Sequence, residues 1–292
     1  MKRWAEIFIA DFQHMEKVEF FRKVLYVFLL INTLTLLPIA WEIWSYNGIT
    51  GSRGFHWSGS YALLNVLSHP KNSSWEWVYV CFVIGQIVFL ISGILKIWPR
   101  VSAVMVYFFT VNLFLKGSIV FTGGEVLINF LLFYLMFVHL PKEGTKWAFF
   151  QNLLNNTFYR LILIQLCILY FFSFLYKMYD ENWVSGEAMM YVARIDHFSS
   201  AGMKWLFAEN RTLAIIATYI TLFYQGAFPI LVWFKKVKLP LLLLGVLIHL
   251  SISFLMGIFA FGIIMSLSYI LFLDERQINK LKGLFQRKAK MS

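Results

Sequence analysis

Long apolar runs, interrupted by few charges, restrict what this chain can fold into. Only 14% of its residues are Asp, Glu, Lys or Arg, whereas about 25% of the residues in a soluble domain are charged. An α-helix needs about 20 apolar residues to cross a hydrocarbon core of about 30 Å, and several runs are that long. The pattern therefore predicts an all-α, polytopic transmembrane helix bundle.

The hydropathy pattern predicts about eight spans. Residues 237–273 are almost uninterrupted apolar sequence, and as one helix they would extend about 55 Å, much more than a bilayer is thick. Gly257 and Gly262 offer a place for the chain to turn back, so we expect two short spans, with one span plus a re-entrant segment as the alternative. The expected spans are residues 24–45, 77–98, 101–121, 124–140, 158–178, 212–234, 238–255 and 258–273.

Basic residues are unevenly distributed among the connecting segments. Most of the 26 Lys and Arg residues fall in segments that lie inside if the N-terminus is inside. Because basic loops stay cytoplasmic, we expect both termini in the cytoplasm and segments 46–75 and 179–211 outside. The net charge of +11 then indicates topology and contact with membrane lipid, and it does not predict nucleic-acid binding.

Three regions follow from this pattern. Residues 1–23 alternate apolar and charged side chains at helical spacing, which predicts an amphipathic interfacial helix. Residues 24–273 form the transmembrane bundle with its two outer loops. Residues 274–292 form a basic cytoplasmic tail.

Lys177 is the first candidate for a chemical role, because it ends an apolar run and a polar cluster follows at once. A lysine at a helix end often lays its stem along lipid and places its ammonium group in the interface. The alternative is an inward, desolvated lysine, because burial favours the neutral amine, which can act as a base. Asp180 or Glu181 would stabilise the charged form if either paired with Lys177.

Several other polar residues lie in or near the spans. His249 is near the middle of a span, where an imidazole is expected to face the bundle, either in a hydrogen bond or in a chemical role. Glu125 opens the fourth expected span, where an acid commonly caps a helix. Arg194, Asp196 and His197 form the densest charged group outside, as in a surface ion-pair network. The spacing of Cys, His and acidic residues indicates no metal site.

The segment LIQLCILYFFSFLYKMYDENWVSGEAMMYV, residues 162–192, resembles the signature segment of the vitamin K-dependent gamma-carboxylase family and its bacterial HTTM (horizontally transferred transmembrane) relatives. The segments GGEVLINFLLFYLMF and LIHLSISFLMGIFAFGIIMSLSYILFL are also similar to spans of that family. TLFYQGAFPILVWF resembles the family too, although many relatives carry an acid where this chain has Gln225. The residues that match the signature are Tyr170, Phe171, Lys177, Trp183, Gly186 and Tyr191.

The resemblance implies chemistry at Lys177. In the family, a lysine deprotonates a reduced quinone, and oxygenation then yields a strong base that allows carboxylation of a glutamate. It implies a quinone pocket lined by Tyr170, His249, Glu125 and Trp183, with vitamin K hydroquinone or menaquinol as the cofactor and no metal. Full carboxylases also have a lumenal C-terminal portion that binds the protein substrate, so the resemblance is to a short form that lacks it.

Two functions therefore remain open from the sequence. The chain is either a lysine-based, quinol-dependent enzyme of the oxygenase or carboxylase type, or a non-catalytic accessory protein that binds or matures a secreted peptide. In both cases we expect an integral protein of a bacterial inner membrane.

Overall fold

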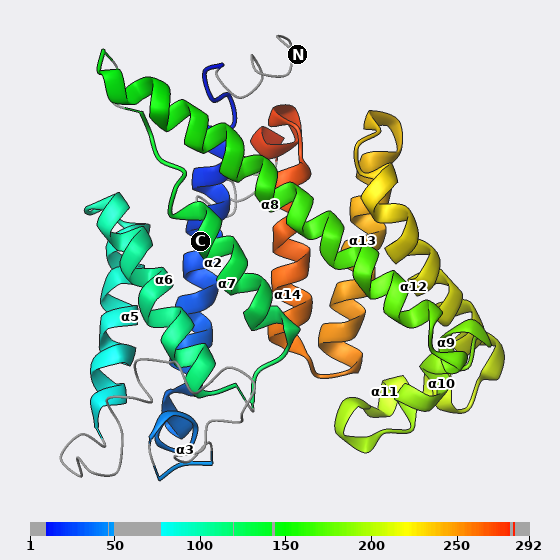
Figure 1. The fold of residues 1–292 in the computed structure, drawn as a ribbon. Coiled ribbons are helices and arrows are strands. Elements are labelled where there is room, and N and C mark those ends of the chain that lie inside the picture. The colour runs from blue at the N-terminus through cyan, green and yellow to red at the C-terminus, as the bar shows by residue number, and fades with distance from the viewer. Residues whose placement is uncertain are drawn as a thin grey trace. The chain divides into compact units, whose positions relative to one another are not determined.

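The computed structural model describes residues 10–45, 47–49, 77–118, 120–141, 144–280 and 283. Within these ranges every regular element is helical, which confirms the all-α fold class (Figure 1). The chain divides into two compact units, residues 1–160 and 161–292. The long helix α8, Lys146–Met178, crosses the boundary and contributes to both.

The first unit is a set of helices packed side by side. They are α2 (Met15–Leu36), which continues through the 3₁₀ turn η1 (Leu37–Ile39) into α3 (Ala40–Trp44), α5 (Val78–Ile94), α6 (Pro99–Lys116) and α7 (Gly123–Leu135). In chain order α2 packs on α5, α5 on α6 and α6 on α7 (Figure 1).

Helix α2 shows why these sequences pack as membrane helices. Phe21, Leu25 and Leu29 recur every four residues and are fully buried, so they form the face that packs on its neighbours. Ile31 and Leu34 on other faces are about half exposed, at 57% and 46%. A helix with apolar residues on both its buried and its exposed faces suits a lipid environment and would be costly in water.

A buried polar chain joins three helices of this unit. Thr33 on α2 donates to Gln86 Oε1 on α5 at 3.0 Å, and Gln86 Nε2 donates to the Thr110 hydroxyl on α6 at 2.9 Å. The sequence predicts such interhelical contacts for polar residues within spans, and Gln86 confirms this.

The C-terminal end of α7 is held by side chains from elsewhere in the first unit. Arg22 on α2 donates to the carbonyl oxygens of Leu135 and Val138, and it pairs with Glu19 at 2.7 Å. The last carbonyls of a helix lack intrahelical partners and attract a cation, so a buried arginine is stabilised there. Asn155 of α8 holds the next residue: its side chain accepts from His139 N at 3.0 Å and donates to His139 O at 2.8 Å.

The beginning of the described chain is bound to the first half of α8. Asn152 accepts from Phe12 N at 3.4 Å and donates to Asp11 Oδ1 at 3.0 Å. Asn156 Nδ2 donates to Ala10 O at 2.7 Å. The interfacial helix expected over 1–23 falls partly on residues 1–9, which lie outside the described residues, and residues 15–23 form the first turns of α2.

The second unit contains the remainder of α8 and three further long or apolar helices: α12 (Arg211–Leu231), α13 (Lys235–Leu255) and α14 (Phe259–Ser268), which continues into η6 (Tyr269–Phe272). Between α8 and α12 lie the short helices α9 (Glu181–Val184), α10 (Ala188–Ala193), η4 (Asp196–Phe198), α11 (Ala201–Met203) and the π-helix η5 (Lys204–Ala208). Of these, α9, α10 and η5 pack against α12.

The turn expected between the last two helices is confirmed. Helices α13 and α14 pack closely on each other and are separated by residues 256–258. Gly257 there has φ +73°, a left-handed conformation that glycine adopts without steric cost. Gly262 does not form the turn but lies within α14, where a Cβ atom would collide with Ser253 Oγ and His249 O.

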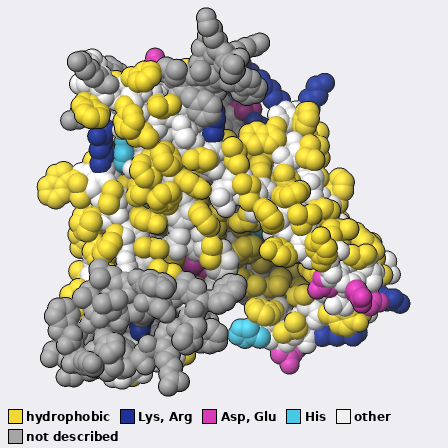
Figure 2. All heavy atoms as spheres, viewed as in Figure 1, with side chains coloured by type: hydrophobic (Ala, Val, Ile, Leu, Met, Phe, Trp, Pro, Cys, Tyr) yellow, Lys and Arg dark blue, Asp and Glu magenta, His cyan; other side chains and the backbone are white. Residues whose placement is uncertain are grey.

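Four helices are long and apolar enough to cross a membrane: Met15–Trp44, Trp147–Met178, Arg211–Leu231 and Lys235–Leu255. Their surfaces agree, because hydrophobic side chains cover α12 and α13 and charged ones gather around residues 181–211 (Figure 2). Helices α5 and α7 are apolar but only 17 and 13 residues long. The count of eight spans therefore stays a prediction, and the expected outer loop 46–75 lies almost wholly outside the described residues.

Candidate functional site

A chain of four hydrogen-bonded side chains lies at the centre of the second unit. Tyr170 of α8 contacts His249 Nε2 of α13 at 2.7 Å, and its hydroxyl also bonds the hydroxyl of Tyr269 of η6. Tyr269 in turn bonds the Tyr224 hydroxyl of α12 at 2.7 Å. No member is more than 3% exposed, so the chain is sealed from solvent.

Small and aromatic neighbours make room for this chain. The Phe228 ring packs 4.2 Å from the ring centre of Tyr170 and 5.7 Å from those of Tyr224 and Tyr269. Gly245 of α13 faces the hydroxyls, since a Cβ atom there would overlap the oxygens of both Tyr224 and Tyr269. Four helical elements therefore meet around three hydroxyls because α13 lacks a side chain at that point.

His249 is only half satisfied. Its Nε2 atom contacts Tyr170, but its Nδ1 atom is buried and has no hydrogen-bond partner among the described residues. The imidazole otherwise contacts aromatic rings, including Phe261 at 5.7 Å between ring centres. A buried nitrogen without a partner is unusual, because leaving such a group unpaired costs about 1–3 kcal/mol.

Lys177 lies two turns beyond Tyr170 on α8 and is half-buried. Its Nζ atom lies over the Trp183 ring, 4.8 Å from the ring centre. Trp183 belongs to α9, whose first turn is capped by Asp180: the carboxylate accepts from Asn182 N at 2.8 Å. The cap directs the chain back so that Trp183 reaches the end of α8.

No carboxylate pairs with Lys177 in the part of the chain that the structure describes, where five ion pairs are found and none involves this residue. Asp180 is engaged at the α9 cap instead. The sequence analysis left open whether Asp180 or Glu181 holds Lys177 as a permanent cation, and neither is positioned to do so.

Glu125 belongs to the first unit and serves as a helix cap. Its Oε2 atom accepts from the backbone N of Thr122 at 2.7 Å and from the Thr122 hydroxyl at 2.9 Å, completing a capping box at the start of α7. This is the ordinary capping role that the sequence suggested for an acid at that position.

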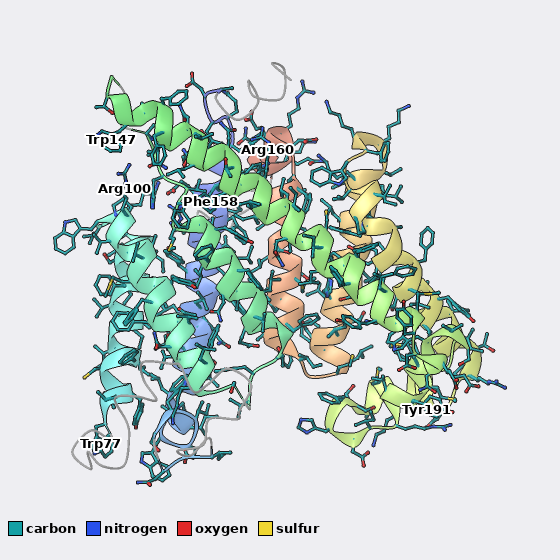
Figure 3. All side chains as sticks on the ribbon, in the orientation of Figure 1. Trp77, Arg100, Trp147, Phe158, Arg160 and Tyr191 are labelled. Carbon is teal, nitrogen blue, oxygen red and sulfur yellow. The ribbon has the colours of Figure 1, made fainter. Side chains whose placement is uncertain are left out.

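The charged group of the outer segment forms separate surface pairs. Asp196 accepts from Lys204 at 2.6 Å, and this charged hydrogen bond lowers the pKa of the Asp196 carboxyl. Glu187 pairs with Arg211 at 2.8 Å and also accepts from Tyr191, which is labelled on α10 in Figure 3. These contacts hold α10 and the start of α12 together without forming a site.

The structure thus brings the sequence-predicted residues together in two pairs, Tyr170 with His249 and Lys177 with Trp183. Sequence reasoning missed Tyr224 and Tyr269, which complete the buried chain. A tyrosine hydroxyl within an apolar span was the available signal, since a buried hydroxyl needs a partner. Among the described residues, no group of three His, Cys, Asp or Glu side chains could hold a metal ion.

Comparison with known proteins places the chain near one bacterial protein. No family model matches the chain, and no solved structure matches it. The four long apolar helices and a bacterial relative indicate an integral membrane protein of bacterial type. The chain is similar to the uncharacterized protein YitO of Bacillus subtilis (strain 168), with 27% identity over 210 residues that cover 67% of this chain and 65% of YitO, less than two thirds of that protein.

Proposed function

We propose that the chain is a membrane enzyme in which Lys177 removes a proton from a reduced, lipid-soluble quinone. The observation that carries the proposal is the setting of Lys177: half-buried at the end of a long apolar helix, with no carboxylate partner among the described residues. Partial burial without a counter-ion favours the neutral amine, the form that can accept a proton.

The chemistry is limited to what the amine can do. The neutral Nζ atom accepts the hydroxyl proton of a quinol, giving an ammonium group and a quinolate. The quinolate reacts with oxygen far more readily than the neutral quinol does. Vitamin K hydroquinone and menaquinol are the quinols implied by the resemblance of residues 162–192 to the carboxylase family, and carboxylation of a glutamate is the further step it suggests.

Trp183 bears on the same question from the other side. An aromatic ring face stabilises a cation by about 0.5–2 kcal/mol, so the contact at 4.8 Å favours the ammonium form. We infer that Trp183 receives the charged product of proton transfer and also limits the fraction of neutral amine.

Substitution of Lys177 tests the proposal. Lys177→Arg and Lys177→Ala are compared with wild type for oxygen uptake in nanodiscs supplied with menaquinol. Guanidinium stays protonated and cannot accept the proton, so both variants should lose the quinol-dependent rate, and an added small amine should restore part of it in Lys177→Ala only. Full retention of the rate in Lys177→Arg would show that only a positive charge is needed and would end the base hypothesis.

A second candidate function is a non-catalytic accessory role in binding a secreted peptide. The observation that favours it is the aromatic surface at the outer segment, where Tyr179 is 88% exposed and Trp205 68% exposed. A photo-crosslinking side chain at position 205 tests it, with position 230 of α12 as the lipid-facing control. A secreted peptide bound at position 205 alone favours this role, whereas lipid adducts at both positions count against it.

A further inference from the structure

The buried chain His249–Tyr170–Tyr269–Tyr224 holds more protons than it can use. Three hydroxyls and one neutral imidazole carry four polar hydrogens, but only three hydrogen bonds join them. One N–H or O–H must therefore lack an acceptor within the chain. Only the two ends of the chain can carry this unmatched group.

The direction of the hydrogen bonds decides which end it is. If the protons run from Tyr224 toward His249, every hydroxyl donates, Nε2 accepts, and only the Nδ1–H of His249 is unmatched. If they run the other way, the Tyr224 hydroxyl hydrogen and the Nδ1 lone pair are both unmatched. Each unmatched buried group costs about 1–3 kcal/mol, so the first direction is favoured.

The three tyrosines thus set the tautomer of His249. With Tyr170 donating to Nε2, the ring proton sits on Nδ1, although free histidine prefers the proton on Nε2. The result is a fixed N–H donor inside the second unit, 3% exposed and surrounded by the rings of Phe261, Tyr170 and Tyr269. A donor of this kind suits a flat, apolar ligand that carries an acceptor oxygen.

We propose that the Nδ1–H of His249 is the hydrogen-bond donor for the carbonyl oxygen of a lipid-soluble quinone, an inference that rests on the proposed function for the class of ligand. Neutral carbonyl oxygens accept from an imidazole N–H without any charge being buried, and the bond supplies the acceptor that the chain lacks. In this role His249 binds the ligand, and Tyr170 is a positioning residue that fixes the imidazole tautomer.

The tautomer is tested first, by ¹⁵N NMR of the full-length protein labelled at histidine, in nanodiscs. The His249 signals are assigned by their loss in His249→Gln. We expect a protonated Nδ1 and an unprotonated, hydrogen-bonded Nε2 in wild type. Tyr224→Phe should keep this pattern, because Tyr269 can still donate to Tyr170, whereas Tyr170→Phe should abolish it. A wild-type spectrum with the proton on Nε2 overturns the inference.

Ligand binding is then measured with 2,3-dimethyl-1,4-naphthoquinone, which lacks the ring position that reacts with thiols. The amide nitrogen of asparagine lies near the Nδ1 position of a histidine, and that of glutamine lies near Nε2. His249→Gln and Tyr170→Phe should therefore raise Kd about tenfold, while His249→Asn and Tyr224→Phe should stay within about threefold of wild type. Adding the quinone should also move the Nδ1 resonance of His249.

A matched ligand without oxygen separates the hydrogen bond from hydrophobic binding. The partitioning of 2,3-dimethylnaphthalene should be the same in all variants. An equal Kd for the quinone in wild type and His249→Gln, or no quinone binding at all, overturns the inference. An Nδ1 resonance that the quinone does not move assigns the acceptor to water or lipid and also overturns it.

These results are separable from those at Lys177. Failure of the oxygen-uptake test with the His249 results intact leaves a quinone-binding protein that does not use Lys177 as a base. Loss of activity in the Lys177 variants with no effect of His249 on Kd leaves the base and removes the donor.

Discussion

His139 illustrates how a single residue at the end of α7 constrains the conditions in which the first unit is stable. Desolvation, together with the nearby Arg22 guanidinium, lowers the pKa of His139 to about 4 from the usual 6.5, although its hydrogen bond to Met136 O at 2.9 Å opposes the shift. The imidazole is therefore neutral in the folded protein at every pH above about 4.

This lowered pKa predicts a loss of stability on acidification. Between pH 6.5 and about 4 the unfolded chain binds a proton at His139 and the folded protein does not, so the free energy of unfolding falls as the pH falls through that window. The full effect is on the order of 3 kcal/mol. Thermal unfolding in detergent at pH 7, 6, 5 and 4 measures it, with His139→Asn as the control. Parallel pH profiles for the two proteins would contradict the assignment.

At the scale of helices, Gly245 explains how α12, α13 and η6 come close enough to share hydroxyl contacts. The position carries no side chain where the oxygens of Tyr224 and Tyr269 lie against α13. Gly202 of α11 is a useful comparison, because a Cβ atom there would meet only ordinary contacts, Leu255 Cδ2 at 3.5 Å and Ser200 Oγ at 3.8 Å.

We expect Gly245→Ala to destabilise the protein by about 1–3 kcal/mol, since the added methyl group forces the helices apart or breaks the hydrogen-bonded chain. Gly202→Ala should lie within about 0.5 kcal/mol of wild type. Thermal unfolding of the purified variants measures both. Equal melting temperatures for the two variants would show that the helices adjust at Gly245 without cost.

The same helices show how far the sequence could be read. The turn at Gly257 was predictable, because an apolar run too long for a bilayer must fold back and glycine allows a left-handed conformation there. The caps at Asp180 and Glu125 followed from local composition. The contact of Tyr224 with Tyr269 was not predictable, since it joins residues 45 positions apart and depends on helix packing that no local pattern specifies.

For the whole molecule, the prediction concerns topology. The distribution of basic residues places both termini in the cytoplasm and residues 179–211 outside, which requires an even number of spans. Single cysteines at positions 185 and 285, introduced after Cys81 and Cys167 are replaced, test this with a membrane-impermeant thiol reagent on intact cells. Position 185 should be labelled and position 285 protected. Labelling of position 285 from outside would exclude eight spans.

The hydrogen bonds from Asn152 and Asn156 to residues 10–12 have a consequence for the biogenesis of the chain. These partners are 140, 141 and 146 positions apart, so the first segment to leave the ribosome cannot reach its final place until α8 has been made. At about 5–20 residues per second, that delay is roughly 7–28 s. During this time the earlier helices of the first unit must enter the bilayer without the contacts that hold their cytoplasmic ends, and a newly made chain that stops short of residue 152 would present Asp11 to the insertion machinery unpaired.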